Sequence, residues 1–250
     1  MSLGQDIAIC LRRRDYSESS QIVTLFAREL GKLRAIAKGA RRPRSPFAGG
    51  VDPLTAGHIG FALPRGDSTL ATLTRFELVH PFAGLRRSLL GLHCAQYAAE
   101  LLDAFTEEQD PHPALYDAFH YALDAWQEDP RPEAILLAFE LALFREIGLA
   151  PDFRHCGACR RPLAPDRRLY FSSSLPGMLC PNCEPAVAEK RFLEPAALAC
   201  LQRPETIAQA DPRAVLDAHE LLGYHQRELL HRPPRTMQFV NKLLRRHRSA

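Results

Sequence analysis

Four of the seven cysteines stand in two closely spaced pairs, a pattern whose usual chemistry is metal binding. The pairs are Cys156-Gly-Ala-Cys159 and Cys180-Pro-Asn-Cys183, with twenty residues between them. A CxxC turn places two thiolates on one side of a tight loop, and two such loops supply four sulfurs at about 2.3 Å from Zn²⁺. Because four sulfurs leave no open coordination position, we expect a structural zinc ion and no metal-bound catalytic water.

The alternative interpretation is a pair of redox motifs. Such motifs normally begin a helix that follows a strand, whereas Pro, Asp and Arg surround both pairs here. The other three cysteines, Cys10, Cys94 and Cys200, lie on apolar faces and are expected to be inert core residues. The first residues, Met-Ser-Leu-Gly-Gln-Asp, are too polar for a secretion signal, so we expect a soluble protein in a reducing cytoplasm.

Positive charge is concentrated at the two ends of the chain. Residues 1–80 hold 12 Lys/Arg and 7 Asp/Glu (+5), residues 81–155 hold 5 and 13 (−8), and residues 156–250 hold 15 and 9 (+6). This distribution suggests that a polyanion meets the ends and not the acidic middle. A second, smaller basic patch, residues 242–248, stands near the C-terminus and could contact nucleic acid or an acidic peptide, or simply complement a helix dipole.

The densest basic run covers residues 32–44. Lys32, Arg34 and Lys38 have the same strand parity and are predicted to share one face, while Arg41, Arg42 and Arg44 follow in a loop. Such a row suits phosphates, and about six contacts predict a slope of log K against log salt of roughly −4 on single strands. The alternative is a solvated charged face. Phe26 and Phe47 are the only aromatic residues near this run, whereas surfaces that stack on bases usually carry more.

The elements that must position these residues follow from hydrophobic periodicity. Five short strands are predicted at residues 6–11, 20–26, 33–37, 58–63 and 69–74, which is the strand count of an OB-fold barrel. Helical periodicity then predicts helices at residues 85–105, 113–127, 132–148, 195–202, 212–231 and 236–247. The predicted fold is multidomain α+β: an N-terminal OB-fold β-barrel (1–80), then an α-helical domain (81–250) with an inserted four-cysteine zinc finger at about 150–190.

Motifs for nucleotide-driven or zinc-dependent catalysis are absent from the sequence, which has no GxxxxGK[ST], GxGxxG or HExxH. Acidic residues that could bind Mg²⁺ in a nuclease cluster at predicted helix ends, although caps and solvated turns are commoner: Glu107, Glu108, Asp110, Glu128 and Asp129. We therefore assign no catalytic residue and expect a protein that is not an enzyme, with a zinc-ribbon nuclease as the alternative. No apolar run approaches the roughly 20 residues of a membrane span.

The ordered set of segments resembles the bacterial recombination mediator family RecO over essentially the whole chain. The resemblance is carried by residues 16–20 and 26–32, by Ala37-Lys-Gly-Ala-Arg-Arg42, by residues 139–144 and 148–151, and by the two cysteine pairs. The cysteine pairs alone are less specific than the ordered set, since some members of the family lack them.

The resemblance implies a DNA-binding factor of recombinational repair, in the bacterial cytoplasm and associated with the nucleoid. Members of this family bind single- and double-stranded DNA through the OB-fold and anneal complementary strands. They pair with RecR, interact with single-stranded DNA-binding protein, and help to load RecA. The DNA role would fall on Lys32, Arg34, Lys38, Arg41 and Arg42, and the sequence itself shows no contact site for either protein partner.

Overall fold

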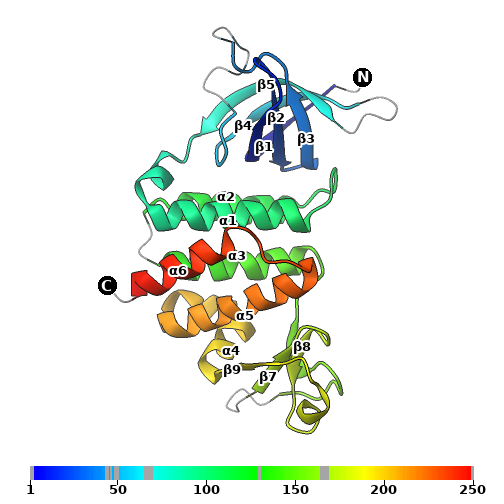
Figure 1. The fold of residues 1–250 in the computed structure, drawn as a ribbon, viewed down its shortest axis with the longest axis vertical. Coiled ribbons are helices and arrows are strands. Elements are labelled where there is room, and N and C mark those ends of the chain that lie inside the picture. Colours follow the sequence, from blue (N-terminus) through cyan, green and yellow to red (C-terminus); the bar gives the residue numbers. More distant parts are fainter. Residues whose placement is uncertain are drawn as a thin grey trace. The chain divides into compact units, whose positions relative to one another are not determined.

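The computed structural model describes residues 3–42, 45, 47, 51–64, 70–128, 131–163 and 169–248. The chain divides into two compact units, residues 1–128 and residues 129–250. The first unit contains a barrel and two helices, and the second contains four helices and the cysteine-bearing insert (Figure 1). A boundary between independently folding domains at residue 80 stays a prediction.

Five strands form the closed barrel of the first unit, in the order β1-β2-β3-β5-β4. They are β1 (Leu3–Asp15), β2 (Gln21–Ala27), β3 (Gly31–Ala37), β4 (Ala56–Ala62) and β5 (Ala71–His80). All pairs are antiparallel except β3 with β5, which is parallel and joins the two halves of the sheet. This arrangement confirms the predicted OB-like barrel.

The alternation along the strands separates a packed interior from an outer face. Val23, Leu25, Leu33 and Ala35 point into the barrel core, so the residues between them point outward. A bulge between Cys10 and Arg12 shifts the register of β1 against β2 and lets β1 continue for four residues beyond the predicted end at Leu11.

Two helices complete the first unit. A 3-10 turn (Ala83–Arg87) leads into α1 (Leu89–Phe105), and α2 (Pro113–Ala125) follows. The prediction placed the start of the first helix at Leu85, but Ser88 accepts a hydrogen bond from the Gly91 amide and caps the α-helix there. Both helices lie beside the barrel within this unit (Figure 1).

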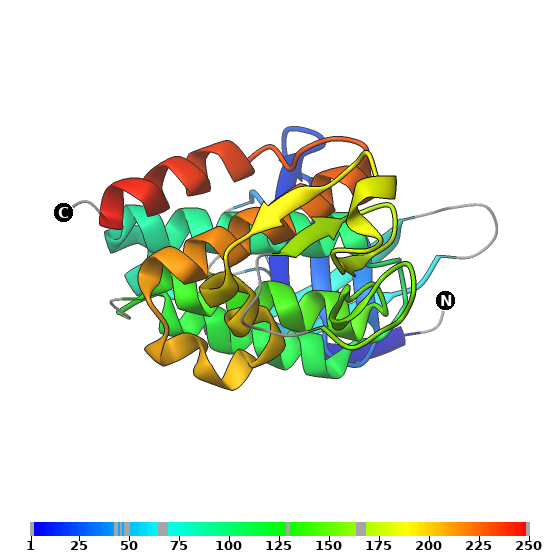
Figure 2. The same ribbon diagram turned by 90° about the horizontal axis from the view of Figure 1, so that it is seen from below.

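The second unit is built on α3 (Pro132–Glu146) and α5 (Pro212–Leu230), which pack against each other. The shorter helices α4 (Pro195–Gln202) and α6 (Met237–Arg248) lie along α5, and a 3-10 segment (Pro204–Gln209) follows α4 (Figure 2). Gly148, with φ at +73°, ends α3 as predicted: the next amide, of Leu149, bonds back to the Phe144 carbonyl.

The insert is a small four-stranded sheet in the order β6-β8-β7-β9. Its strands are β6 (Asp152–Cys156), β7 (Leu169–Ser172), β8 (Gly177–Leu179) and β9 (Arg191–Leu193), with a 3-10 turn at Glu184–Ala186. The sheet is attached to the helices of its own unit, because β6 packs on α4 and β9 packs on α5. The four-cysteine insert therefore lies within a helical unit, as predicted.

Candidate nucleic-acid interface and metal centre

The outer face of β1, β2 and β3 carries the predicted basic row. The strand register places Arg12, Thr24 and Arg34 side by side in one row and Arg14, Ile22 and Ile36 in the next. Thr24 is only 7 % exposed although it lies on the outer face, because long side chains flank it on both neighbouring strands. Cations from two strands thus share one surface.

One end of this outer face is covered by the helices and is not available to a ligand. Phe26 on β2 stacks on Tyr116 of α2, with ring centroids 6.4 Å apart. Beside it on β3, Lys32 is 8 % exposed, and its ammonium donates to the carbonyls of Asp103 (2.6 Å) and Thr106 (2.5 Å) at the end of α1. This burial argues against the predicted contact between Lys32 and DNA, because the charge of Lys32 satisfies helix carbonyls, and we leave Lys32 out of the proposed interface.

Two further predicted cations form ion pairs at the surface. Arg34 lies 3.6 Å from Glu108 and Arg41 lies 3.6 Å from Asp15, and both arginine side chains remain between 40 and 50 % exposed, at 43 % and 49 %. Exposed pairs of this length are weak, about 0–1 kcal/mol. Both arginines can therefore exchange a carboxylate for a phosphate at small cost.

On this face and the turn that follows β3, four exposed cations have no acidic partner among the residues that the structure describes: Arg12, Arg14, Lys38 and Arg42. Lys38 and Arg42 belong to the predicted set, and Arg44, also predicted, lies outside the described residues. Arg12 and Arg14 were missed, because β1 was predicted to end at Leu11. A longer predicted strand would not have been enough, because Ala8 and Cys10 point into the barrel and it is the bulge after Cys10 that turns Arg12 and Arg14 to the outer face.

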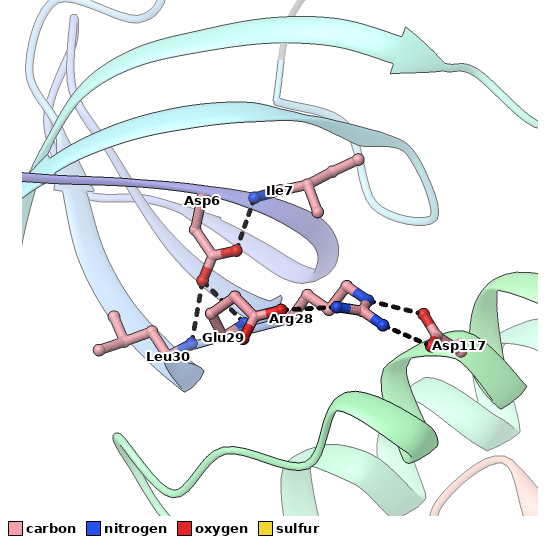
Figure 3. Close-up of polar contacts among 6 residues, drawn as sticks. All are labelled: Asp6, Ile7, Arg28, Glu29, Leu30 and Asp117. Atoms are coloured by element: carbon pink, nitrogen blue, oxygen red, sulfur yellow. Dashed lines mark hydrogen bonds and ion pairs between the residues drawn. The ribbon is translucent and has the colours of Figure 1, made fainter.

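A second tie between the barrel and its helices lies at the turn between β2 and β3. Arg28 donates to both carboxylate oxygens of Asp117 on α2, at 2.9 and 2.8 Å (Figure 3). Asp6 fixes the same turn by accepting from the amides of Glu29 and Leu30. The bond from Arg28 lowers the pKa of Asp117. Arg28 is thus engaged with the helices and does not extend the basic face.

The metal centre is formed at the ends of β6 and β8. The ligand atoms of Cys156, Cys159, Cys180 and Cys183 all lie within 4.8 Å of one another. Sulfurs at about 2.3 Å from a tetrahedral zinc are about 3.8 Å apart, and the sulfurs of Cys159 and Cys180 are 3.7 Å apart. The four predicted residues therefore have the spacing that a tetrahedral metal requires, although the identity of the metal is a separate question.

Local backbone geometry explains how the two cysteine pairs meet. Gly157 donates to the Met178 carbonyl, which ties the first pair to β8, and the Cys180 amide points at the sulfur of Cys156 at 3.4 Å. A side chain at residue 157 would collide with the Leu175 carbonyl, since a Cβ there would lie 2.2 Å from its oxygen. The glycine of the first CxxC is thus required by a close approach to the turn between β7 and β8.

The electrostatics of the four thiols fit a bound cation. Burial alone would raise the pKa of Cys156, but amide donors from Cys159, Cys180 and Ala158 outweigh it and lower that pKa to about 6. Hydrogen bonds to the neighbouring thiols raise the pKa of Cys183 to about 12. The Cys156 thiolate is therefore stabilised by the backbone, whereas a positive charge among the sulfurs would favour ionisation of Cys183.

A carboxylate anchors the insert to the helical unit. Glu189 accepts from the Ser172 hydroxyl at 2.7 Å and from the amides of Ser173 and Ser174 at 3.0 Å, and Tyr224 on α5 donates to its other oxygen. Burial would raise the pKa of Glu189, but these donors lower it. The Ser172–Ser174 run thus holds a structural carboxylate.

The acidic residues considered as magnesium ligands in the nuclease alternative include two that pair with basic side chains in the structure. Glu108 pairs with Arg34, and Asp110 lies 3.1 Å from His112. Asp129 lies outside the described residues. Within the described ranges, no metal-ligating group other than the four cysteines brings three or more ligand atoms together.

No helix among the described residues is both long and apolar enough to cross a membrane.

The chain was also compared with known proteins. The family model described as "Recombination protein O N terminal" matches residues 1–82, and the model described as "Recombination protein O C terminal" matches residues 86–238.

Curated relatives give the same result over most of the chain. The DNA repair protein RecO of Rhodopirellula baltica is 39 % identical over 181 residues, covering 72 % of this chain and 67 % of the relative. RecO of an Anaeromyxobacter strain is 38 % identical over 72 % of this chain and 70 % of its own length. RecO of Bacillus subtilis is 33 % identical over an alignment that covers 70 % of this chain and 66 % of the relative. With both halves matched in order, the chain belongs to the RecO family of DNA repair proteins.

Proposed function

We propose that this protein is a recombination mediator that binds single- and double-stranded DNA through the outer face of β1–β3 and anneals complementary strands. With RecR it assists the loading of RecA onto strands that carry single-stranded DNA-binding protein. The resemblance in sequence supports these partners, and no surface is assigned to them. A cytoplasmic, nucleoid-associated location follows from the same role.

The observation that carries the proposal is the exposed set of cations without acidic partners on this face. Arg12 and Arg14 reach it from β1, and Lys38 and Arg42 reach it from the end of β3 and the turn beyond. Arg34 and Arg41, held only by weak surface pairs, can add to the set. Contacts to phosphates carry no sequence information, so binding of DNA by this face is expected to be independent of sequence.

Annealing follows from the same electrostatics. Two DNA strands repel each other through their phosphates, and a surface that neutralises several phosphates on one strand lowers the barrier to approach of the other. The role proposed for the metal is structural. Zn²⁺, as the metal suited to four thiolates, would cross-link the loops of the insert and stabilise the helical unit.

The test is a charge reversal on the proposed face with a matched control elsewhere. Arg14→Glu combined with Lys38→Glu should abolish annealing of complementary oligonucleotides and leave the thermal melting curve unchanged. The control is Arg145→Glu combined with Arg213→Glu, which alters the net charge equally at side chains 72 and 74 % exposed on α3 and α5. Annealing retained by the first variant refutes the interface, and strands shortened in the presence of Mg²⁺ would instead support the nuclease alternative.

A further inference from the structure

An exposed aromatic ring lies at the tip of the turn between β1 and β2. Tyr16 is 63 % exposed, and no ring contact or side-chain hydrogen bond joins it to any other described residue. Its backbone is nevertheless ordered by the turn, since the Tyr16 amide donates to the Ser20 carbonyl at 3.0 Å and the Ser17 amide donates to the same oxygen at 3.2 Å. The ring is therefore presented to solvent from a hydrogen-bonded base.

The turn that carries Tyr16 is joined to the turn that carries the free cations. The Arg41 amide donates to the Ser19 carbonyl at 3.2 Å, and the Gly39 amide donates to the Ser20 hydroxyl at 3.5 Å. Arg41 also pairs with Asp15, the residue directly before the tyrosine. The ring thus lies at the same end of the barrel as Lys38 and Arg42, and at the end of the strand that carries Arg12 and Arg14.

Exposure alone does not make a binding residue, and the same unit contains the comparison. Tyr121 on α2 is 71 % exposed, slightly more than Tyr16. Its neighbours on the helix surface are Asp117, four residues before it, and Asp124, three residues after it. Both tyrosines offer a ring to solvent, but the cation nearest Tyr121 in the structure, Arg28, is held by Asp117, whereas Tyr16 lies at the end of the barrel that carries the cations without acidic partners.

We propose that Tyr16 is a stacking subsite for an unpaired nucleobase of the DNA strand whose phosphates the basic face holds. The inference rests on the proposed function and adds a preference for single strands. A base in a duplex already has stacking partners on both sides, so the ring gains little from it, whereas an unpaired base offers a free face. The contribution is independent of sequence, because every base has a π-face.

The experiment compares Tyr16→Ala with Tyr121→Ala in the full-length protein. A labelled oligonucleotide is titrated at fixed salt as a single strand and as a duplex of the same length. We expect Tyr16→Ala to weaken single-strand binding by roughly tenfold, the size typical of one stacked base, and to change duplex binding by less than about twofold, with Tyr16→Phe close to wild type. Tyr121→Ala should change neither.

A second readout reports the stacking itself. The only tryptophan of the chain, Trp126, is buried, so Tyr16→Trp adds an exposed indole whose fluorescence should be quenched by single-stranded DNA. Tyr121→Trp should show no quenching. If Tyr16→Ala binds single strands as tightly as wild type, or weakens both substrates equally, the stacking subsite is overturned while DNA binding stands. If the wild-type protein binds neither substrate, the proposed function itself fails.

Discussion

The salt dependence of DNA binding can be predicted from the number of free cations on the outer face. The six-residue row expected from the sequence predicts a single-strand slope near −4. The structure places Lys32 under α1 and adds Arg12 and Arg14 from β1. Four cations without acidic partners, at about 0.7 per phosphate, give a slope near −3, which means a loss of about 50-fold in affinity between 50 and 200 mM salt.

Neutral substitutions test this count one residue at a time. Lys38→Gln should make the slope less negative by about 0.7, and Arg14→Gln by the same amount, because each removes one phosphate contact. Lys32→Met should leave the slope unchanged and lower the melting temperature instead, since it removes an ammonium bonded to two helix carbonyls. The assay is fluorescence anisotropy of a labelled oligothymidine at five or more salt concentrations.

Two results would refute the reasoning. The first is an unchanged slope for Lys38→Gln, which would mean that this exposed cation contacts no phosphate. The second is a change of about 0.7 for a folded Lys32→Met variant, which would mean that the ammonium leaves its carbonyl partners to reach the DNA. A control substitution far along the chain, Arg145→Gln, should leave both slope and affinity unchanged.

Three further predictions concern the stability of the two units. Metal analysis should find one zinc per chain, lost in Cys180→Ser, and chelation should raise hydrogen exchange in residues 150–190 before the helices; faster exchange in the barrel first would contradict this. Burial would lower the pKa of His219, but the buried carboxylate of Glu140 outweighs it and raises that pKa above 6.5. The stabilisation from this pair should therefore be fully present below pH 6.5 and be lost as pH rises through the raised pKa. Urea melts of His219→Gln should lack this pH dependence. Trp126→Ala should cost the first unit about 3–5 kcal/mol in the same assay, and a loss below 1 kcal/mol would show that the site collapses around the gap.

The barrel and the metal centre could be predicted because their signals are local. Alternating or short apolar runs predict each strand of the barrel. Each CxxC motif likewise predicts two metal ligands within four residues. The prediction ended the longest strand, β1, at Leu11, because the next three residues are all arginine and show no alternation. A bulge restores the alternation there, and a bulge leaves no mark in the sequence that a parity count can find.

The burial of Lys32 could not be predicted because it depends on which helix packs where. Lys32 on β3 and Lys38 directly after it have the same parity, so sequence periodicity predicts the same role for both. The end of α1 covers one of them and leaves the other exposed. The carbonyls that receive the ammonium come from residues more than 70 positions away, Asp103 and Thr106, and nothing near the lysine in the sequence indicates their approach.

The carbonyls at the end of α1 that bond Lys32, together with Tyr116 and Asp117 on α2, make the first two helices part of the packing that stabilises the barrel. A fragment cut after His80 would remove both acceptors of that ammonium and leave it to the solvent, and it would expose the ring of Phe26 that now stacks on Tyr116. Arg28 would lose both of its bonds to Asp117 in the same cut. A fragment meant to test the proposed DNA-binding unit alone should therefore retain the chain through residue 128, where the last turn after α2 is complete.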